Sequence, residues 1–256
     1  MNDLNDLIIQ AKKTHAAQAI KQLAIDCLDY TSLNETDTED DIRTLLQTAI
    51  TPLGHVAAIC IYPEFVDFAK RERQEKAVNI ATVANFPDGD GSLNDVIFAV
   101  KTSLFDGADE IDIVLPYKAY LAGNKTDAIN LIETAKSICG DKTLKVILET
   151  GALKDLSIIA AASHDCLTAG ADFLKTSTGK IATGATLEAA AIMLQTIKTY
   201  RQTHQRTVGF KASGGVRTAK EAAQYIALAT KIMGSGWVSR ETFRIGASSL
   251  LIDLLK

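Results

Sequence analysis

Two lysines at matched positions of two predicted strands are the residues best suited to chemistry. Lys175 follows two large apolar residues in the run 172–177, and Lys211 stands at the same level of the run 207–212. Neighbouring strands lie about 4.8 Å apart, so inward-pointing side chains would bring two ammonium groups together in a poorly solvated interior. Burial and a nearby like charge each lower a lysine pKa, and a neutral lysine can form a Schiff base with a carbonyl substrate. The alternative is that either lysine points outward and reaches solvent between helices.

Carboxylates recur at every second position of the run 109–115, where alternation puts Glu110 and Asp112 on one face. The apolar residues between them should face the helices, which directs both carboxylates inward. Asp112 lies nearer the carboxyl end of the strand, so we expect it to transfer protons. Asp29, at the end of an earlier strand, is a further candidate of the same kind.

The run 144–150 likewise puts Lys145 and Glu149 on one face. Buried carboxylates need cationic partners or a raised pKa, and Lys145 could supply one such partner. For Glu110 and Lys145 an interior ion pair that only supports the fold is an equally good interpretation.

Two glycine-containing turns follow the last two predicted strands and indicate a phosphate site. Glycines let a backbone approach a ligand closely, and serines at the start of a short helix donate hydrogen bonds to phosphate oxygens. A lysine after the strand that carries Lys175 could add a positive charge. The predicted set is Lys180, Gly214, Gly215, Gly246, Ser248 and Ser249.

These residues must be positioned by strands that alternate with helices. Eight runs rich in branched aliphatic residues have strand character, and stretches of helical periodicity separate them. The runs are 25–31, 56–62, 78–85, 109–115, 144–150, 172–177, 207–212 and 242–247. Strict alternation predicts parallel pairing, and eight units in 256 residues are typical of a TIM (β/α)8 barrel. A doubly wound open sheet is the competitor, but it would favour a glycine-rich turn after the first strand, where residues 32–35 read Ser-Leu-Asn-Glu.

The ends and the composition set the remaining expectations. An extra N-terminal helix over about residues 3–23 should cover the bottom of the barrel, and without any visible linker we expect one domain over residues 1–256. The 27 basic and 31 acidic residues give a net charge of −4, which argues against nucleic-acid or membrane-surface partners. The four cysteines show neither zinc-ligand spacing nor a disulfide framework, so we expect no metal and a reducing compartment.

Several segments together resemble one enzyme family. They are residues 28–34, 57–63, 110–114, 173–180, 209–217 and 244–249. On these segments the chain resembles the deoxyribose-phosphate aldolases, which are class I, or Schiff-base, aldolases. The resemblance extends over nearly the whole chain, and the segment around Lys175 is its most specific part.

The resemblance implies an aldehyde-lyase of the TIM-barrel fold that reversibly cleaves 2-deoxyribose 5-phosphate into glyceraldehyde 3-phosphate and acetaldehyde. It implies that Lys175 forms the Schiff base, that Lys211 perturbs the pKa of Lys175 and that Asp112 is the acid/base. It also places Thr178 at the site, Cys60 at the acetaldehyde end, and the phosphate on the set given above. It further implies no cofactor, a cytoplasmic role in deoxynucleoside breakdown, and a homodimer.

Two other functions remain open at this point. Another Schiff-base barrel enzyme, such as a transaldolase, would share the lysine and the phosphate loops. A sugar-phosphate-binding protein without chemistry would keep the loops, but it would not need two adjacent interior cations beside a carboxylate.

Overall fold

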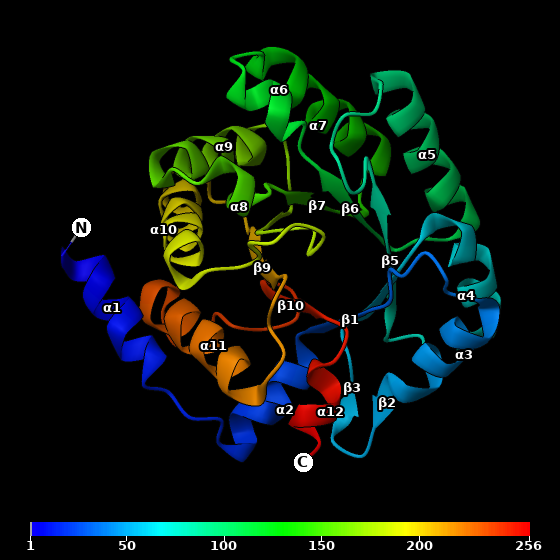
Figure 1. Ribbon diagram of the computed structural model, residues 1–256, viewed down its shortest axis with the longest axis horizontal. Coiled ribbons are helices and arrows are strands. Elements are labelled where there is room, and N and C mark those ends of the chain that lie inside the picture. Colours follow the sequence, from blue (N-terminus) through cyan, green and yellow to red (C-terminus); the bar gives the residue numbers. More distant parts are fainter. Residues whose placement is uncertain (1) are drawn as a thin grey trace.

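The computed structural model describes residues 2–256, and its centre is a closed barrel of eight parallel strands (Figure 1). In chain order these strands are β1 (Leu28–Thr31), β4 (Ala58–Ile61), β5 (Asn79–Ala84), β6 (Glu110–Val114), β7 (Thr143–Ile147), β8 (Phe173–Lys175), β9 (Gly209–Ser213) and β10 (Phe243–Ala247). Consecutive strands are neighbours, and β1 closes the ring because it pairs with both β4 and β10. The predicted TIM barrel is therefore confirmed, and the open sheet is excluded.

Helices surround the barrel on its outside (Figure 1). They are α3 (Glu39–Thr48), α4 (Val66–Glu72), α5 (Leu93–Asp106), α6 (Tyr117–Leu121), α7 (Lys125–Cys139), α8 (Thr150–Leu153), α9 (Leu156–Thr168), α10 (Leu187–His204), α11 (Ala219–Met233) and α12 (Leu250–Leu254). A 3-10 turn (Pro63–Phe65) precedes α4, and a small hairpin of β2 (Ile50–Thr51) and β3 (Gly54–His55) precedes β4. Within residues 2–256 no helix combines the length and apolar character that crossing a membrane requires.

Local sequence explains where these helices begin and end, and α5 is an example. The hydroxyl of Ser92 accepts a hydrogen bond of 3.2 Å from the backbone N–H of Asp95, which caps the first turn. Val96 and Val100 recur at helical spacing and are buried towards the strands. Gly107 ends the helix with φ of 108°, a left-handed conformation that glycine adopts without strain.

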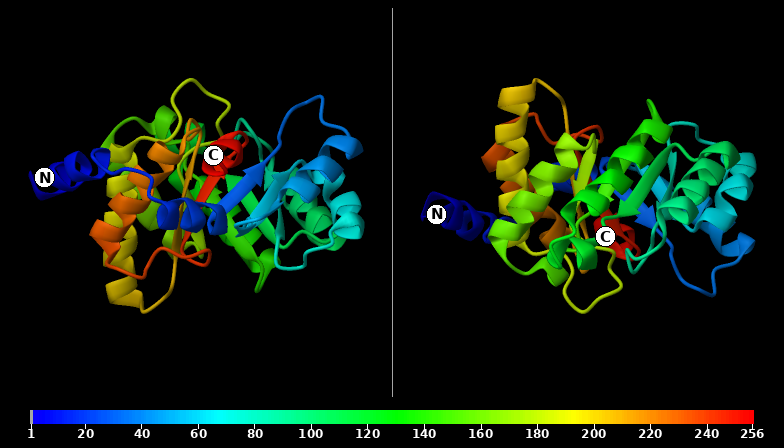
Figure 2. Two further views of the ribbon diagram at one scale, coloured as in Figure 1. Left: turned by 90° about the horizontal axis from the view of Figure 1, so that it is seen from below. Right: turned by 90° about the horizontal axis from the view of Figure 1, so that it is seen from above.

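The predicted helical segment before β1 is confirmed, but its extent and position differ from the prediction. It forms two helices, α1 (Asn2–Lys12) and α2 (Gln18–Asp26), instead of one helix over about residues 3–23. Neither lies under the barrel: α1 packs on the outer faces of α11 and α10, and α2 contacts α11, α12 and β3. Figure 2 shows α1 projecting to one side of the helix ring in both views.

The strand prediction over 144–150 extended too far. β7 ends at Ile147, Glu149 adopts the left-handed conformation with φ of 55°, and Thr150 begins the short helix α8. A residue with a side chain rarely adopts this conformation, and such positions cluster at functional sites. Residues 148–150 therefore resemble a strand in the sequence because they are buried, although they do not belong to the sheet.

Two separate apolar clusters stabilise the barrel. The larger lies between the strands and the helices and is built from the outward-facing residues of the strands, such as Ile111, Ile113 and Val146. The smaller lies inside the barrel beside β4 and β5 and consists of Leu33, Ala58, Cys60, Ala81 and Val83. The rest of the interior, described next, is charged.

Candidate active site

Lys175 and Lys211 converge on one carboxylate oxygen inside the barrel. The parallel register of β8 and β9 places the two lysines directly opposite each other. Their Nζ atoms donate to Oδ2 of Asp112, at 2.8 Å from Lys175 and 2.7 Å from Lys211. All three side chains are almost fully buried. The two lysines thus point inward, and Asp112 reaches them from β6.

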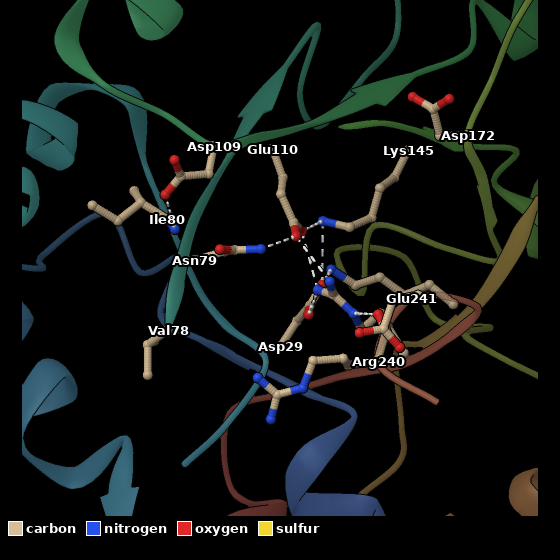
Figure 3. A network of polar contacts seen from close by, with 12 residues as sticks. Asp29, Val78, Asn79, Ile80, Asp109, Glu110, Lys145, Asp172, Arg240 and Glu241 are labelled. Atoms are coloured by element: carbon tan, nitrogen blue, oxygen red, sulfur yellow. Dashed lines mark hydrogen bonds and ion pairs between the residues drawn. The ribbon is translucent and has the colours of Figure 1, made fainter. Parts of the chain in front are cut away.

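Further charges extend this cluster towards the bottom of the barrel. Nζ of Lys145 contacts Oδ1 of Asp112 at 2.8 Å and also pairs with Glu110 and Asp29. Nζ of Lys211 lies 2.5 Å from Oδ2 of Asp29. Figure 3 shows Asp29, Glu110 and Lys145 pointing towards one another from three different strands. Lys145 therefore joins the Asp112 layer to the layer below it.

Arg244 is an interior cation that the sequence analysis did not single out. Its Nη1 lies 2.6 Å from Oδ1 of Asp29, and its Nη2 lies 2.8 Å from Oε1 of Glu110. Asn79 donates to the same Glu110 oxygen at 2.8 Å. Strand alternation carried the missing signal, because Arg244 stands between Phe243 and Ile245, whose side chains belong to the outer core.

The buried charges balance only if one lysine is neutral. The carboxylates are those of Asp29, Glu110 and Asp112, and the cations are those of Lys145, Lys175, Lys211 and Arg244. An uncompensated charge in a protein interior is costly, so the cluster favours loss of one proton. The lysine with the fewest carboxylate contacts is Lys175, whose only ion pair within residues 2–256 is with Asp112.

The pKa shifts agree with this charge balance. Burial lowers the pKa of Lys175, Asp112 opposes the change, and the positive charge of Lys211 lowers it further. Burial also acts to lower the pKa of Lys211, but the carboxylates of Asp112 and Asp29 outweigh it and raise that pKa. The expectation that both lysine pKa values fall is therefore wrong for Lys211, because a second carboxylate holds its proton.

The carboxyl groups of the cluster are held in the ionised form. Burial alone would raise the pKa of Asp112, but Lys145, Lys175 and Lys211 bring it well below its ordinary value. The same competition lowers the pKa of Asp29, where Lys145, Lys211 and Arg244 outweigh burial. Asp112 is therefore an anion that can accept a proton or a hydrogen bond directly beside a neutral amine.

Thr178 and Lys180 lie on the loop between β8 and α10, at the carboxyl end of the barrel. The hydroxyl of Thr178 donates to Oε2 of Glu149 at 2.5 Å and accepts the backbone N–H of Lys180 at 3.1 Å. The ammonium of Lys180 donates to the carbonyl oxygen of Leu33 at 2.6 Å. Lys180 thus extends across the mouth of the barrel, from the loop after β8 to the loop after β1.

The predicted phosphate residues surround the same end of the barrel. Gly214 and Gly215 follow β9 and have φ values of 88° and 90°, a backbone conformation that residues with a side chain rarely adopt. Gly246 lies in β10, and the exposed residues Ser248 and Ser249 lead into α12. The two loops come from neighbouring strands, so their backbone groups lie at one edge of the mouth.

The loop after β8 is packed tightly between its neighbours. A methyl group added to Gly184 would collide with the carbonyl oxygen of Gly214. One added to Gly151, in α8, would collide with the carbonyl oxygen of Thr183. Only glycine permits these backbone contacts, so the loops after β7, β8 and β9 form one packed unit.

Cys60 is buried on the apolar side of the interior. It faces the charged cluster closely enough that Lys211, Asp112 and Lys175 all influence its thiol. Burial nevertheless dominates and raises the pKa of Cys60, so the thiol is neutral at pH 7. Within residues 2–256 no group of three or more His, Cys, Asp and Glu side chains is arranged to hold a metal ion.

Comparison with known proteins assigns the family. Residues 23–255 match the model described as the DeoC/LacD family aldolase. The chain belongs to this family. It is therefore an aldolase, a lyase whose family acts on small sugar phosphates. The match includes every strand of the barrel and all the site residues described above.

Three solved structures have the same architecture. A protein of Toxoplasma gondii proposed to be a deoxyribose-phosphate aldolase is 27% identical, with a TM-score of 0.84 over 93% of this chain and 96% of that one. A protein of Coccidioides immitis with the same proposed activity is 26% identical, with a TM-score of 0.79 over 100% of this chain and 98% of that one. The deoxyribose-phosphate aldolase of Aeropyrum pernix, which is tetrameric, is 24% identical with a TM-score of 0.70 over 98% of this chain and 96% of that one, and it bears on the fold alone.

Proposed function

We propose that this aldolase reversibly cleaves 2-deoxyribose 5-phosphate into glyceraldehyde 3-phosphate and acetaldehyde through a Schiff base on Lys175. The observation that carries the proposal is the contact of both Lys175 and Lys211 with one oxygen of Asp112, at 2.8 and 2.7 Å. This arrangement supplies a neutral amine, a permanent cation and a carboxylate within one buried cluster. A Schiff-base cleavage needs the amine and the carboxylate, and the cation keeps the amine neutral.

Cleavage begins when the neutral amine of Lys175 attacks the C1 aldehyde of the open-chain sugar. Loss of water from the addition product gives an iminium ion, whose positive charge withdraws electrons from the neighbouring carbon atoms. The iminium group can then accept the electron pair of the bond between C2 and C3 as that bond breaks.

The bond that breaks is C2–C3, because it is the carbon–carbon bond one atom removed from the iminium carbon. The C2–C3 electron pair moves onto C2 and forms the enamine with the iminium carbon, while C3 becomes the aldehyde carbon of glyceraldehyde 3-phosphate. The C3 hydroxyl must lose its proton in this step. The ionised carboxylate of Asp112, 2.8 Å from Nζ of Lys175, is the base nearest to the reacting atoms, and an ordered water can relay the proton.

The second half of the reaction releases acetaldehyde. Protonation of the enamine at C2 restores an iminium ion, and water hydrolyses it to acetaldehyde and the free amine of Lys175. Lys211 has two roles in this scheme. Its positive charge keeps Lys175 neutral, and its hydrogen bond to Asp112 orients the carboxylate that carries the proton back.

The phosphate group is proposed to bind at the glycine loops after β9 and β10, with Lys180 as a positive partner. This set is Lys180, Gly214, Gly215, Gly246, Ser248 and Ser249, all at the mouth of the barrel. Binding so far from the reacting bond orients the sugar chain towards Lys175. The apolar residues beside Cys60 are proposed to contact the two-carbon end that becomes acetaldehyde.

The test is to trap the Schiff base with borohydride in the presence of acetaldehyde and to locate the adduct by peptide mass spectrometry. We expect a reduced ethyl group on Lys175, and we expect deoxyribose 5-phosphate to compete with its formation. The Lys175→Ala variant should show neither the adduct nor cleavage of deoxyribose 5-phosphate, while its circular dichroism spectrum stays that of a folded barrel. Substantial turnover by that variant, or a wild-type adduct on another lysine only, would contradict the proposal.

A further inference from the structure

Three buried polar atoms near Lys175 have no hydrogen-bond partner within residues 2–256. They are Oε1 of Glu149, Oγ1 of Thr150 and Oγ of Ser177, and all three residues lie where β7 and β8 end. Glu149 and Ser177 are both 0% exposed. Leaving a buried polar atom unpaired costs free energy, so a cluster of such atoms calls for a partner that the protein itself does not supply.

Backbone contacts place these residues side by side, just beyond the proposed Schiff-base lysine in sequence. β7 and β8 pair with Ile147 opposite Lys175, and beyond the strands the backbone N–H of Thr150 donates to the carbonyl oxygen of Thr176 at 2.9 Å, so residues 149–150 lie alongside residues 176–178. The Cβ atom of Ser177 lies beside Gly214, in the loop after β9. Glu149 is also near enough for Lys175 to influence its carboxyl group. Together the two residues therefore extend from Lys175 to the loop after β9.

One half of the Glu149 carboxyl group is already engaged. Oε2 accepts the hydroxyl of Thr178 at 2.5 Å and the backbone N–H of Thr178 at 3.3 Å. This contact fixes the carboxyl group in place and leaves Oε1 as the free oxygen. Glu149 also has a left-handed backbone, with φ of 55°, and such strain is typical of functional sites.

The proposed substrate has one polar group without an assigned partner. Its aldehyde reacts with Lys175, its C3 hydroxyl faces Asp112, and its phosphate occupies the glycine loops. Only the C4 hydroxyl remains, and it lies between the reacting carbon and the phosphate. Glu149 lies near Lys175, and Ser177 lies beside Gly214 of the loop after β9, so the two residues extend from the reacting lysine to those loops.

We propose that Glu149 Oε1 and Ser177 Oγ bind the hydroxyl group next to the cleaved bond, which is C4–OH of the sugar and C2–OH of glyceraldehyde 3-phosphate. This inference rests on the proposed function. The carboxylate oxygen accepts the hydroxyl proton, and the serine donates to the hydroxyl oxygen. A polar site built in this way selects 2-hydroxyaldehydes, because an acceptor that lacks the hydroxyl leaves both protein groups unpaired.

The experiment measures condensation with acetaldehyde for two acceptors, glyceraldehyde 3-phosphate and 3-oxopropyl phosphate, which has the same chain without the hydroxyl. The readout is the ratio of their kcat/KM values. We expect the wild-type protein to favour glyceraldehyde 3-phosphate, and we expect Glu149→Gln and Ser177→Ala each to reduce that preference by about tenfold. Both substitutions preserve the size of the side chain closely enough to retain the fold.

Ser163→Ala is the matched control. Ser163 is also a fully buried serine, but its hydroxyl donates to the carbonyl oxygen of Ile159 within α9, at 2.7 Å. Its acceptor preference should equal that of the wild-type protein. If Glu149→Gln and Ser177→Ala reduce the rates of both acceptors equally, the two residues have only a structural role and the inference is wrong.

Trapping of the wild-type protein with acetaldehyde tests the Schiff-base proposal separately from this inference, which rests on it. If an adduct forms on Lys175 but the acceptor preference is unchanged in both variants, the hydroxyl site is overturned and the Schiff-base proposal stands. If no adduct forms and neither acceptor reacts, both proposals are overturned together.

Discussion

The two sides of the barrel interior are built on opposite principles. The side formed by β4 and β5 is lined by small apolar residues, Ala58, Cys60, Ala81 and Val83. The side formed by β6 to β10, together with β1, carries seven charged groups that pair with one another, and they are those of Asp29, Glu110, Asp112, Lys145, Lys175, Lys211 and Arg244. Cys60 is in β4 and Lys175 is in β8, so both sides meet across the centre of one barrel.

The difference teaches how one interior can serve two purposes. Small apolar side chains leave room and exclude competing hydrogen-bonding groups, which suits an apolar two-carbon fragment. Charged side chains hold protons at fixed positions, and each must be balanced because burying a charge is expensive. We therefore expect any single substitution on the charged side to lower activity and stability strongly, and a substitution on the apolar side to have a small effect.

The largest effect is expected from Asp112→Asn. This change removes the negative charge that Lys145, Lys175 and Lys211 share, so buried cations are left unbalanced. We expect cleavage of deoxyribose 5-phosphate to fall by about 10²–10⁴-fold, as for loss of a general acid/base. We also expect the free energy of unfolding to fall by about 3 kcal/mol, the cost of breaking a buried ion pair. Steady-state kinetics and urea denaturation measure the two effects.

Asp67→Asn is the control for this prediction. Asp67 pairs with Arg71 on the surface of α4, where both side chains are 63% exposed. Exposed pairs contribute little, so activity should not change and stability should change by at most about 0.5 kcal/mol. If the Asp112→Asn variant were as active and as stable as this control, Asp112 would be needed neither for catalysis nor for the charge balance of the interior.

A second, smaller effect is expected in the pH dependence of imine formation. In the proposed mechanism only the neutral form of Lys175 attacks the aldehyde, and the pKa of Lys175 lies below the ordinary 10.5. The trapping rate should therefore rise with pH, and the midpoint of this rise should lie below pH 10.5. In Lys211→Met the like charge is absent and Asp112 has one cation fewer to balance, so the pKa of Lys175 rises and the rate profile shifts to higher pH.

Lys136→Met is the matched comparison, because Lys136 pairs with Asp172 outside the barrel, at 2.7 Å. Its profile should coincide with that of the wild-type protein. A profile for Lys211→Met that stays in place, or that moves to lower pH, would mean that Lys211 does not control the charge of Lys175.

The smallest effect is expected on the apolar side, from Cys60→Ala. The thiol is neutral because burial raises its pKa, so it is expected to fill space rather than react. We expect kcat/KM for cleavage to change by no more than about threefold, and stability to fall by about 1 kcal/mol for the lost apolar volume. Cys166→Ala removes a buried thiol from α9 and should cost similar stability with no change in activity. A loss of activity of about 100-fold or more in Cys60→Ala alone would assign the thiol a chemical role, since it would match the contribution of an acid/base group.

Much of this architecture was predictable from local patterns in the sequence. Alternation within strands identified the inward direction of Glu110 and Asp112, and the level of Lys175 beside Lys211 followed from their places in adjacent strands. These patterns depend only on the period of a β-strand, which is why they transfer to the structure.

Other features depend on contacts between distant segments and escaped prediction. The raised pKa of Lys211 requires knowing that Asp29, 182 positions earlier, reaches the same ammonium. The left-handed turn at Glu149 is invisible in a buried apolar run, because periodicity reports burial and not backbone direction. The break between α1 and α2 reflects packing against α11, which the N-terminal sequence alone does not encode.

The packing of glycines against neighbouring main chain at the mouth of the barrel limits how freely single loops can be exchanged. Loops on barrels are commonly regarded as interchangeable parts that can be varied one at a time to obtain new specificities. Here Gly151 fits against Thr183, and Gly184 fits against Gly214, so each loop is shaped by the main chain of the next. The shapes of the three loops therefore depend on one another. The loops can be exchanged between relatives as a set, whereas a change to one loop alone must be matched by a change in its neighbour.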